Sequence, residues 1–557
     1  MFILLMISSV VYTTPNNNST FTAAYNAHCS VKNEQELRNA ITTAVSEAPT
    51  QYIIALTNDI TLTGSSLTIP TKANVVLINN NNTPKKLIGP NGTNTIHVAG
   101  GATLVLDGIT ITHNKGDIGR GVYVNTSATL VLNSGEITEN NIYTGGIIND
   151  AQCGGGIYNW GTFTMNGGTI SKNSAYNGGA IYSIVSFEMN AGEISENTAA
   201  GAGGGADNLG TFTMNGGTFY KNDAGNGGGV FNGVYATFTL TDGKFLENEA
   251  TNGCGGAVYN DGYGTFTLTG GTFSKNKAYD GGGVYNLGIF TMSGGTIDGA
   301  TPAESNIAIE SGGGVCNGGY FSEFSLIDGI ISNNIAKNGG GVEITAGVFN
   351  MLGGEISDNT AFWGGGVFIG DSTIFNMEGG VLSENTANYY GGGVYNWWGT
   401  FTMSGDAAIS NNKTPYDGGG VYNQRYFVML GNAVIANNTA KGNGGGVHNS
   451  ATCNLFDNAA ISDNTASFGG GIHIEQGQLT LSDNTAIINN IAINFGGGIQ
   501  NTNQGRIILS DNTAISNNSA NYGGGIFTTS TNTNAVTING GQISNNTAHH
   551  SGGGAYT

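Results

Sequence analysis

The stretch GGGIYNWGTFTMNGGTISKNSAYN, from Gly154 to Asn177, contains three short segments that are typical of β-strands. They are residues 157–159, 162–165 and 169–171. The second segment, Thr-Phe-Thr-Met, alternates polar and apolar residues with a period of two, as a half-buried strand does. Glycine-rich corners, which allow positive φ and close backbone approach, separate the segments. The stretch therefore predicts three strands and three corners, which together make one coil of a β-helix.

This unit recurs about every 26 residues, and a glycine block marks each copy. The 16 blocks start at Gly154, Gly178, Gly203, Gly227, Gly255, Gly281, Gly312, Gly339, Gly364, Gly391, Gly418, Gly444, Gly469, Gly496, Gly523 and Gly552. One unit cannot bury its apolar face alone, so neighbouring units must stack. We predict an all-β chain in which residues 119–557 form a single right-handed parallel β-helix of about 16 regular coils.

Stacking in register would align equivalent residues into columns along the rod. The second strand repeats an apolar pair, as in Phe163/Met165, Phe187/Met189, Phe212/Met214 and Phe266/Leu268. We predict that these side chains face inward. Methionine at such regular spacing is typical of core filling rather than of a soft-metal site.

Asparagine forms a second row, which falls five to seven residues before the glycine block in 15 units from Asn173 to Asn546. Stacked amides can hydrogen-bond along the axis of the rod. Asparagine also tolerates the left-handed conformation that a tight corner requires. We interpret this row as structural, because a ligand site does not need 15 copies.

The N-terminal region departs from the repeat. Residues 1–18 begin with an apolar run that is too short to span a bilayer, and they are predicted to be a signal peptide; the alternative is a buried first strand. Residues 19–118 are predicted to form an N-terminal cap and irregular first coils, with extended segments at 52–60, 67–69, 75–78, 96–98, 103–106 and 109–112. A short capping helix opens at Asn33, and its buried face is predicted to be Leu37, Ile41, Ala44 and Val45.

At the other end, the chain stops at Thr557 inside a repeat. We expect either a fragment or a rod end that something else covers. Contact with a membrane is expected only through an anchor that is not visible in this chain.

Composition excludes several classes of function. The chain has 17 basic and 37 acidic residues, a net charge of −20, which argues against a nucleic-acid partner. Its 95 glycines accompany 23 tyrosines and 24 phenylalanines, so the chain is not a disordered linker. The five cysteines have no metal-ligand spacing and do not form a disulfide framework. With the predicted leader, these features indicate a secreted or cell-surface protein.

Two short motifs carry a resemblance to a known family. Residues 178–181 read Gly-Gly-Ala-Ile and residues 255–258 read Gly-Gly-Ala-Val. Residues 219–222, 245–248 and 273–276 each read Phe-x-x-Asn. Over about residues 119–557 the chain thus resembles the chlamydial polymorphic membrane proteins, whose passengers carry many copies of both motifs. Similar repeats occur in surface proteins of trichomonads and gut microbes.

This resemblance implies a surface-displayed β-helix that adheres to host cells. It marks six motif residues as candidate binding residues: Phe219, Asn222, Phe245, Asn248, Phe273 and Asn276. Most other units carry the looser Gly-Gly-Gly and Ile-Ser-x-Asn, and both motifs also have the structural interpretation given above.

Two classes of function fit such a rod. We favour an adhesin-like binding or structural protein, not an enzyme, that displays the rod to a host-cell surface protein, a matrix or a glycan. The alternative is a polysaccharide lyase or glycoside hydrolase of the pectate-lyase-like type, which needs clustered or paired carboxylates. No cofactor is predicted, and Ca²⁺, although possible, is not indicated.

The residues that could carry such chemistry are few. Four Asp-Asn pairs begin at Asp358, Asp463, Asp483 and Asp511, and we interpret them as solvated corners in the same turn of several units. Arg506 is the one arginine close in sequence to such a corner. His448 and His473 lie one repeat apart and could stack or bind a metal, although outward surface histidines are commoner.

Aromatic residues at the corners are the better candidates for contact with a partner. They are Tyr176, Tyr279, Trp363, Tyr389, Tyr390, Trp397 and Trp398. We favour Trp397 and Trp398 as the contact, while packing against the neighbouring coil is the alternative. Thr-x-Thr pairs such as Thr162/Thr164 form an outward array that would suit ice or a regular polymer, but Glu188 and Asn376 interrupt it.

Overall fold

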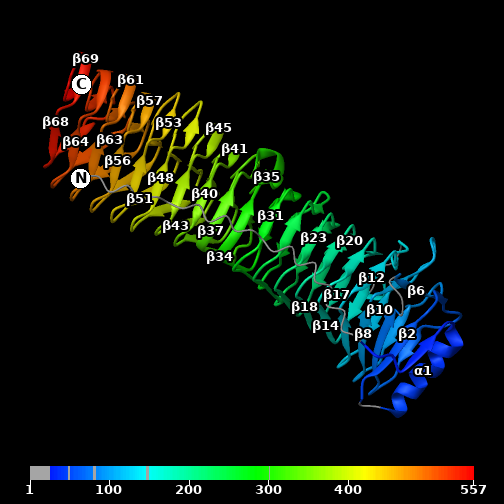
Figure 1. Ribbon diagram of the computed structural model, residues 1–557. Coiled ribbons are helices and arrows are strands. Elements are labelled where there is room, and N and C mark those ends of the chain that lie inside the picture. The colour runs from blue at the N-terminus through cyan, green and yellow to red at the C-terminus, as the bar shows by residue number, and fades with distance from the viewer. Residues whose placement is uncertain (1–24, 48–49, 80–82, 146–149, 300) are drawn as a thin grey trace, which may run out of the picture.

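The computed structural model describes residues 25–47, 50–79, 83–145, 150–299 and 301–557. The predicted signal peptide lies outside these residues. The described chain is mostly β-strand with one short α-helix and forms a parallel β-solenoid of about 20 turns. The coils stack into an elongated rod with the helix at its N-terminal end (Figure 1).

One coil contains four strands rather than the three that were predicted. Strands β13 (Ile157–Asn159), β14 (Thr162–Met165) and β15 (Thr169–Ser171) lie where the repeat places them. The fourth, β16 (Ser174–Ala175), pairs with β20 (Thr198–Ala202) of the next coil. Sequence patterning missed it because two small residues before a glycine block carry no visible alternation.

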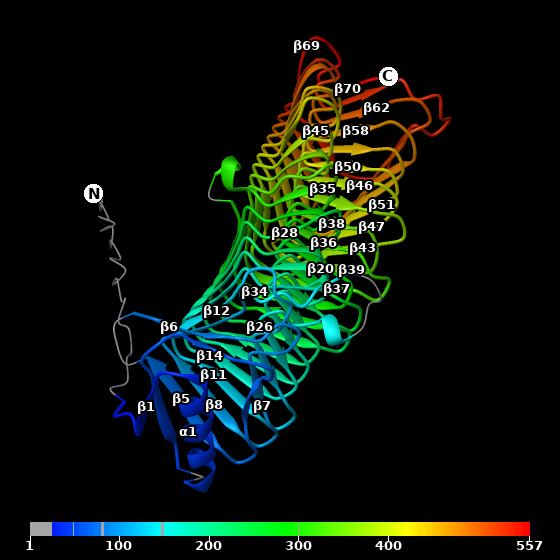
Figure 2. The ribbon, with the colours of Figure 1, turned by 90° about the vertical axis from the view of Figure 1, so that its right-hand side faces the viewer.

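These strands form three sheets, of which two run the length of the described rod and the third begins at β16. Sheet A has 37 strands and contains the β14-type and β15-type ladders, which β34 (Ile289–Asp298) and β37 (Glu323–Ser332) join. Sheet C, the β16-type ladder, has a run of six strands and a run of eight. Figure 2 shows the stacked coils from the side.

Sheet B is the β13-type ladder and has 19 strands. In chain order they are β4 (Leu67–Ile69), β7 (Ile96–Val98), β10 (Val122–Val124), β13, β17 (Ile181–Ser183), β21 (Ala206–Asn208), β25 (Val230–Asn232), β29 (Val258–Asn260), β33 (Val284–Asn286), β36 (Val315–Asn317), β38 (Val342–Ile344), β42 (Val367–Ile369), β46 (Val394–Asn396), β50 (Val421–Asn423), β54 (Val447–Asn449), β58 (Ile472–Ile474), β62 (Ile499–Asn501), β66 (Ile526–Thr528) and β70 (Ala555–Tyr556).

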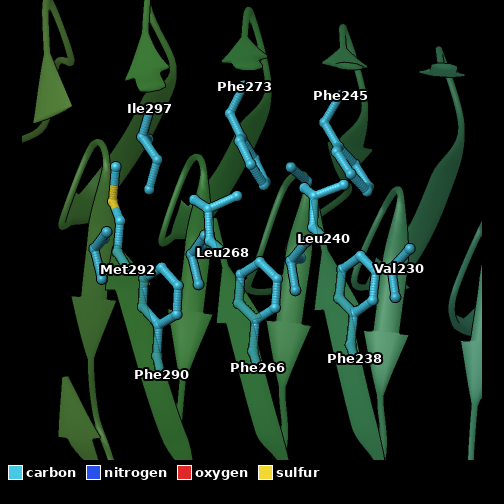
Figure 3. Close-up of a cluster of buried hydrophobic side chains, with 14 of the residues drawn as sticks. Val230, Phe238, Leu240, Phe245, Phe266, Leu268, Phe273, Phe290, Met292 and Ile297 are labelled. Atoms are coloured by element: carbon cyan, nitrogen blue, oxygen red, sulfur yellow. The ribbon is translucent and has the colours of Figure 1, made fainter. Parts of the chain in front are cut away.

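The predicted inward columns are confirmed. Phe163, Phe187 and Phe212 lie in register, are at most 1% exposed, and stack with ring centroids 5.1 and 4.4 Å apart. A second column of inward phenylalanines faces this one across the core, as Figure 3 shows for Phe245 and Phe273 above Phe238 and Phe266. Burial of each ring contributes about 1.5–3 kcal/mol to the stability of the fold. A coil gains this burial only when neighbouring coils stack on it.

The asparagine row forms a buried amide ladder, as predicted. It runs through 16 residues from Asn140 to Asn546, and each Nδ2 donates to Oδ1 of the next asparagine at 2.9–3.1 Å. The second Nδ2 hydrogen satisfies a carbonyl of the preceding coil, as from Asn197 to Ile170 at 2.9 Å. Each amide from Asn140 to Asn518 is therefore buried with its donors and acceptor paired.

One detail of this prediction is wrong. The left-handed residue of the corner is not the ladder asparagine but the residue before it, such as Lys172 (φ 55°) and Glu196 (φ 54°). The extended asparagine can then direct its side chain into the core while its neighbour turns the chain.

The N-terminal cap is helix α1 (Glu34–Ser46), as predicted, with Asn33 Oδ1 accepting from the Glu36 N–H at 3.0 Å. Its buried residues are Leu37, Ala40, Ile41 and Ala44, whereas Val45, predicted to be buried, is 40% exposed. A strand that was not predicted, β1 (Cys29–Val31), precedes the helix and pairs with β2 (Tyr52–Leu56).

The first coils are more regular than predicted. The segment expected at 52–60 divides into β2 and β3 (Ile60–Thr61), and the remaining strands are β5 (Asn74–Asn79), β6 (Lys85–Ile88), β8 (Thr103–Asp107) and β9 (Ile109–Thr112). Strand β10 pairs with β7 on one side and β13 on the other. The hydrogen-bonded ladder of sheet B therefore continues across residues 118 and 119, where the repeat sequence changes.

The amide ladder should dominate local stability. Asn248→Ala would leave the Asn222 Nδ2 donor, the Asn222 backbone N–H and the Phe219 carbonyl without their present partners inside the rod. We expect a loss of roughly 3 kcal/mol, because each buried unpaired group costs about 1–3 kcal/mol. The matched control is Asn190→Ala, which breaks the same kind of amide–amide bond on the exposed surface and should cost under about 1 kcal/mol. Urea unfolding followed by circular dichroism measures both; equal losses would contradict the prediction.

Candidate functional site

A column of aromatic side chains stands on the outer face of sheet B. The first and third residues of a sheet B strand point into the core, and the middle residue points outward. In β42, β46 and β50 these middle residues are Phe368, Tyr395 and Tyr422, which stack at centroid distances of 5.2 Å and form a cluster separate from the main core. Each is only 8% exposed, and the partly buried Trp363 and Tyr390 pack against the three rings.

Around Phe368 and Tyr395 the column forms the floor of an open cavity of about 320 Å³. Its other lining residues are Asn338, Trp363 and Trp397. Trp363 ends β41 (Thr360–Trp363) of sheet C, whereas Trp397 lies at the corner after β46. We call these five residues the aromatic groove.

The groove has a buried floor and one exposed wall. Trp397 is 46% exposed, and its ring lies 6.3 Å from that of Phe368. The column continues past the groove, where Tyr390 packs on Tyr422 at 4.7 Å. The Tyr395 hydroxyl donates to Oε1 of Gln424 at 3.3 Å. The groove therefore presents flat apolar rings with amide and hydroxyl groups at their edges.

Buried carboxyl groups interrupt the column at two points. Asp207 of β21 is 2% exposed and Glu343 of β38 is 4% exposed, and one oxygen of each has no hydrogen-bond partner. Burial, with a smaller contribution from Asp261, raises the pKa of Asp207 to about 8. Burial likewise raises the pKa of Glu343 to about 8. Both groups are therefore mostly protonated at neutral pH.

Glu343 is the carboxyl group next to the groove, because it lies in register with Phe368. Its free oxygen, Oε2, exposes less than 1 Å². A general acid must reach the glycosidic oxygen of its substrate. In this conformation the Glu343 carboxyl is covered and does not meet that condition.

The two histidines singled out in the sequence do stack, but they are not on the open surface. His448 of β54 and His473 of β58 continue the outer column of sheet B after Tyr422 and are 2% and 5% exposed. His448 stacks on Tyr422 at 4.4 Å, and the two histidine Nδ1 atoms are 3.2 Å apart. Both rings lie on the outer side of sheet B but are covered, so the preference for exposed surface histidines was wrong.

The motif residues that the family resemblance marked for binding lie inside the rod. Phe219, Phe245 and Phe273 are fully buried and stack at 4.9 Å. Asn222, Asn248 and Asn276 belong to the amide ladder. A ligand on the outer surface of the folded rod does not touch these six side chains, so their candidacy is corrected to a structural role.

The two tryptophans that were predicted to contact a partner lie in different surroundings. Trp397 lines the groove, whereas Trp398, 49% exposed, lies outside its lining and faces Arg425, whose guanidinium carbon is 5.7 Å from the ring centroid. Sequence reasoning missed Phe368 and Tyr395. The available signal was the aromatic residue that follows Val or Ile directly after most glycine blocks.

The aspartates of the four Asp-Asn pairs are exposed, as predicted, but Asn359 and Asn464 are buried in the amide ladder and the pairs do not share one turn. Asp358 and Asp463 occupy the left-handed position before the amide ladder. Asp483 and Asp511 occupy another corner, where the Asp483 N–H donates to Oδ2 of Asp511 at 3.3 Å. Within the residues that the structure describes, no three His, Cys, Asp or Glu side chains are placed to hold a metal ion together.

Comparison of the chain with protein-family models, with curated proteins and with solved structures found no match. In the described part of the chain, no helix combines the length and the apolar character needed to cross a membrane.

The buried Asp207 carboxyl should make stability depend on pH. The group ionises near its ordinary pKa in the unfolded chain but only near pH 8 in the folded rod, so it disfavours folding increasingly from about pH 4 to about pH 8. Asp207→Asn should therefore raise the free energy of unfolding at pH 7, on the order of a few kcal/mol, and have little effect at pH 3.

Asp242→Asn is the matched control, because Asp242 is an exposed aspartate whose Oδ1 accepts the Gly243 N–H, a bond that asparagine can also accept. Urea unfolding at several pH values measures both variants. A gain in the free energy of unfolding of Asp207→Asn that is independent of pH would contradict this interpretation.

Proposed function

We propose that this protein is a non-enzymatic, adhesin-like binding protein of the cell surface or extracellular space, and that its aromatic groove holds a glycan. The observation that carries the proposal is the cavity lined by Trp363, Phe368, Tyr395 and Trp397 with Asn338 at its edge. A sugar ring has a flat face of C–H groups that packs on an aromatic ring and an edge of hydroxyl groups that hydrogen-bonds to amides.

The shape of the groove favours an extended chain over an isolated small molecule. Its aromatic floor runs along the rod from Phe368 to Tyr395, one ring for each of two adjacent coils. A linear oligosaccharide laid along the axis would meet a ring at both steps. The acidic balance of the chain, with 37 acidic and 17 basic residues, favours a neutral or cationic glycan over an anionic one.

The repeat sequence supports placement outside the cell. The resemblance to the chlamydial polymorphic membrane proteins and the predicted leader favour a surface-displayed rod, with a host-cell surface protein or glycan as the partner. A rod of stacked coils holds its groove in a fixed position along its length, which suits display.

The alternative, a polysaccharide lyase or hydrolase, has one observation in its favour, the protonated Glu343 beside the groove. The covered oxygen of that group argues for the binding function instead.

Consecutive tryptophans provide a matched test of the glycan groove. We expect the wild-type chain to bind a subset of glycans on a microarray, and Trp397→Ala to weaken binding of the best of them by about tenfold, because a stacking contact of roughly 1.4 kcal/mol is lost. Trp398→Ala removes a residue of the same type and exposure outside the groove and should change the affinity by less than about twofold. Calorimetric titration measures both. The absence of any glycan ligand, or equal losses in the two variants, would reject the groove.

A second experiment separates binding from catalysis. The bound glycan is incubated with the wild-type chain, with and without Ca²⁺, and its chain length is followed by mass spectrometry. We expect no shortening. Shortening that disappears in Glu343→Gln would identify an enzyme and overturn the binding proposal.

A further inference from the structure

The pattern Asn-x-Ser/Thr, which the proposed function does not use, recurs among the described residues. In secreted proteins this pattern is the acceptor of N-linked oligosaccharides. It begins at Asn91, Asn125, Asn412, Asn437, Asn517 and Asn545. An asparagine-rich chain also produces such triplets by chance, so the position of each asparagine in the fold decides whether it can carry a sugar.

Three of these asparagines occupy one corner of the rod, the left-handed position directly before the amide ladder. Asn437, Asn517 and Asn545 have φ angles of 57–58°, and all three side chains are exposed. Within the described residues their side-chain amides make no hydrogen bond. The Nδ2 atom to which a sugar would be attached therefore has no part in holding the fold.

Asn412 has the same sequence pattern but is closed to modification. It is fully buried in the amide ladder, and its Nδ2 donates to Oδ1 of Asn438 and to the carbonyls of Leu382 and Ser410, each at 3.0 Å. A sugar on this nitrogen would remove one of its two hydrogens and bring a bulky polar group into the interior. The sequence pattern does not distinguish Asn412 from Asn437, whereas burial does.

The surface beside Asn437 has room for a sugar residue. An open hollow of about 540 Å³ is lined by Asn437 and Thr439, and Lys413 and Lys441 also contribute to its lining. The hydroxyl and ammonium groups of these side chains can hydrogen-bond to the hydroxyl groups of a first sugar residue. Asn437 therefore combines an unbonded Nδ2 atom with polar space next to it.

We propose that Asn437, Asn517 and Asn545 carry N-linked oligosaccharides. This inference rests on the part of the proposed function that places the chain outside the cell, because such oligosaccharides are attached on the secretory route.

The donor is an oligosaccharide linked to a lipid pyrophosphate, and a membrane transferase of the cell catalyses the transfer. The asparagine Nδ2 attacks the anomeric carbon of the sugar. The new C–N bond replaces the C–O bond to phosphate, the lipid pyrophosphate leaves with the electron pair, and Nδ2 loses one hydrogen as a proton.

The chain contains matched internal controls at the same corner. Asn411 and Asn489 are also exposed and left-handed, each with a φ of 57°. The third residue of their triplets is Lys413 and Ile491, so the acceptor pattern is not satisfied. Both should remain unmodified, which separates a requirement for the pattern from exposure alone.

The sugars would leave the aromatic groove open. The acceptor corner precedes a sheet C strand, as Asn437 precedes β53 (Thr439–Ala440). In the coil that forms the groove, the equivalent corner residue is Asp358, whereas the groove residue Trp363 ends β41. Acceptors and groove therefore lie at opposite ends of the sheet C strands, and glycan binding by the groove can be tested separately.

The test is peptide mass spectrometry of the folded full chain from two sources. One is the native cells, and the other is a eukaryotic expression host in which the chain is secreted behind a leader of that host. Peptide N-glycosidase in heavy-oxygen water converts each modified asparagine to a labelled aspartate. We expect the label at the three proposed asparagines in both preparations, and none at Asn411, Asn412 or Asn489.

Substitutions in the expression host test the pattern directly. Thr439→Ala should lose the sugar on Asn437, and Thr439→Ser should keep it. Ile491→Thr completes the pattern at Asn489 and should add one sugar. Ile491 is 50% exposed and its neighbour in the column is Thr465, so a hydroxyl side chain is already accommodated there. The intact mass measures the gain or loss of one oligosaccharide in each variant.

The inference is overturned if any of the three asparagines lacks the label in the native chain, or if Asn411, Asn412 or Asn489 carries it. Label in the expression host without label in the native cells would overturn the inference and argue against placement outside the cell. Absence of label from both preparations would overturn the inference at the corner itself and leave the groove proposal standing.

Discussion

Vertical register is the constraint on which the rest of this structure depends, and the buried amide ladder enforces it. Each ladder asparagine is satisfied only when the next coil presents its own asparagine at the same level. A slip of one residue would leave several amide donors unpaired in an apolar interior, at about 1–3 kcal/mol each. The spacing between ladder neighbours nevertheless varies from 24 to 33 residues. Extra residues are therefore accommodated in the corners, while the ladder keeps the strands aligned.

The same register builds the outer surface. Residues about 26 positions apart become neighbours about 5 Å apart, so one substitution per coil changes the character of a whole column. On sheet B the outer column passes from stacked tyrosines to a buried acid, then to the aromatic groove and then to the facing histidines. Groove and histidine pair are thus two segments of one column, and each is assembled from separate coils.

The stacking register also aligns charged residues into columns on the surface of the rod. The left-handed corner residues alternate in sign through Lys172, Glu196, Lys221, Glu247 and Lys275, with ion pairs of 3.5–3.9 Å within the column. Exposed pairs of this kind contribute little stability. Their alternation avoids like charges stacked at the spacing of the coils, which would oppose the parallel register. The alternation does not extend along the whole rod, because Asp358 and Glu384 are neighbours in the same column and Asp483 lies against Asp511 at another corner.

The sequence by itself determined the solenoid, the inward Phe and Met columns and the amide ladder, because these features recur at fixed positions from unit to unit and any stacking in register must bury them. The capping helix was predictable from the apolar face of its own sequence. The sequence also pointed to Trp397 as a surface residue. Only the tertiary structure decided that Trp363 and Trp397 share a groove floored by Phe368 and Tyr395, and that His448 faces His473. The physical reason lies in the corners between the strands. Whether an outward side chain is exposed or covered depends on the corner segments beside its strand. These corners vary in length and composition from coil to coil, so the repeat pattern does not specify the surroundings of each outward side chain.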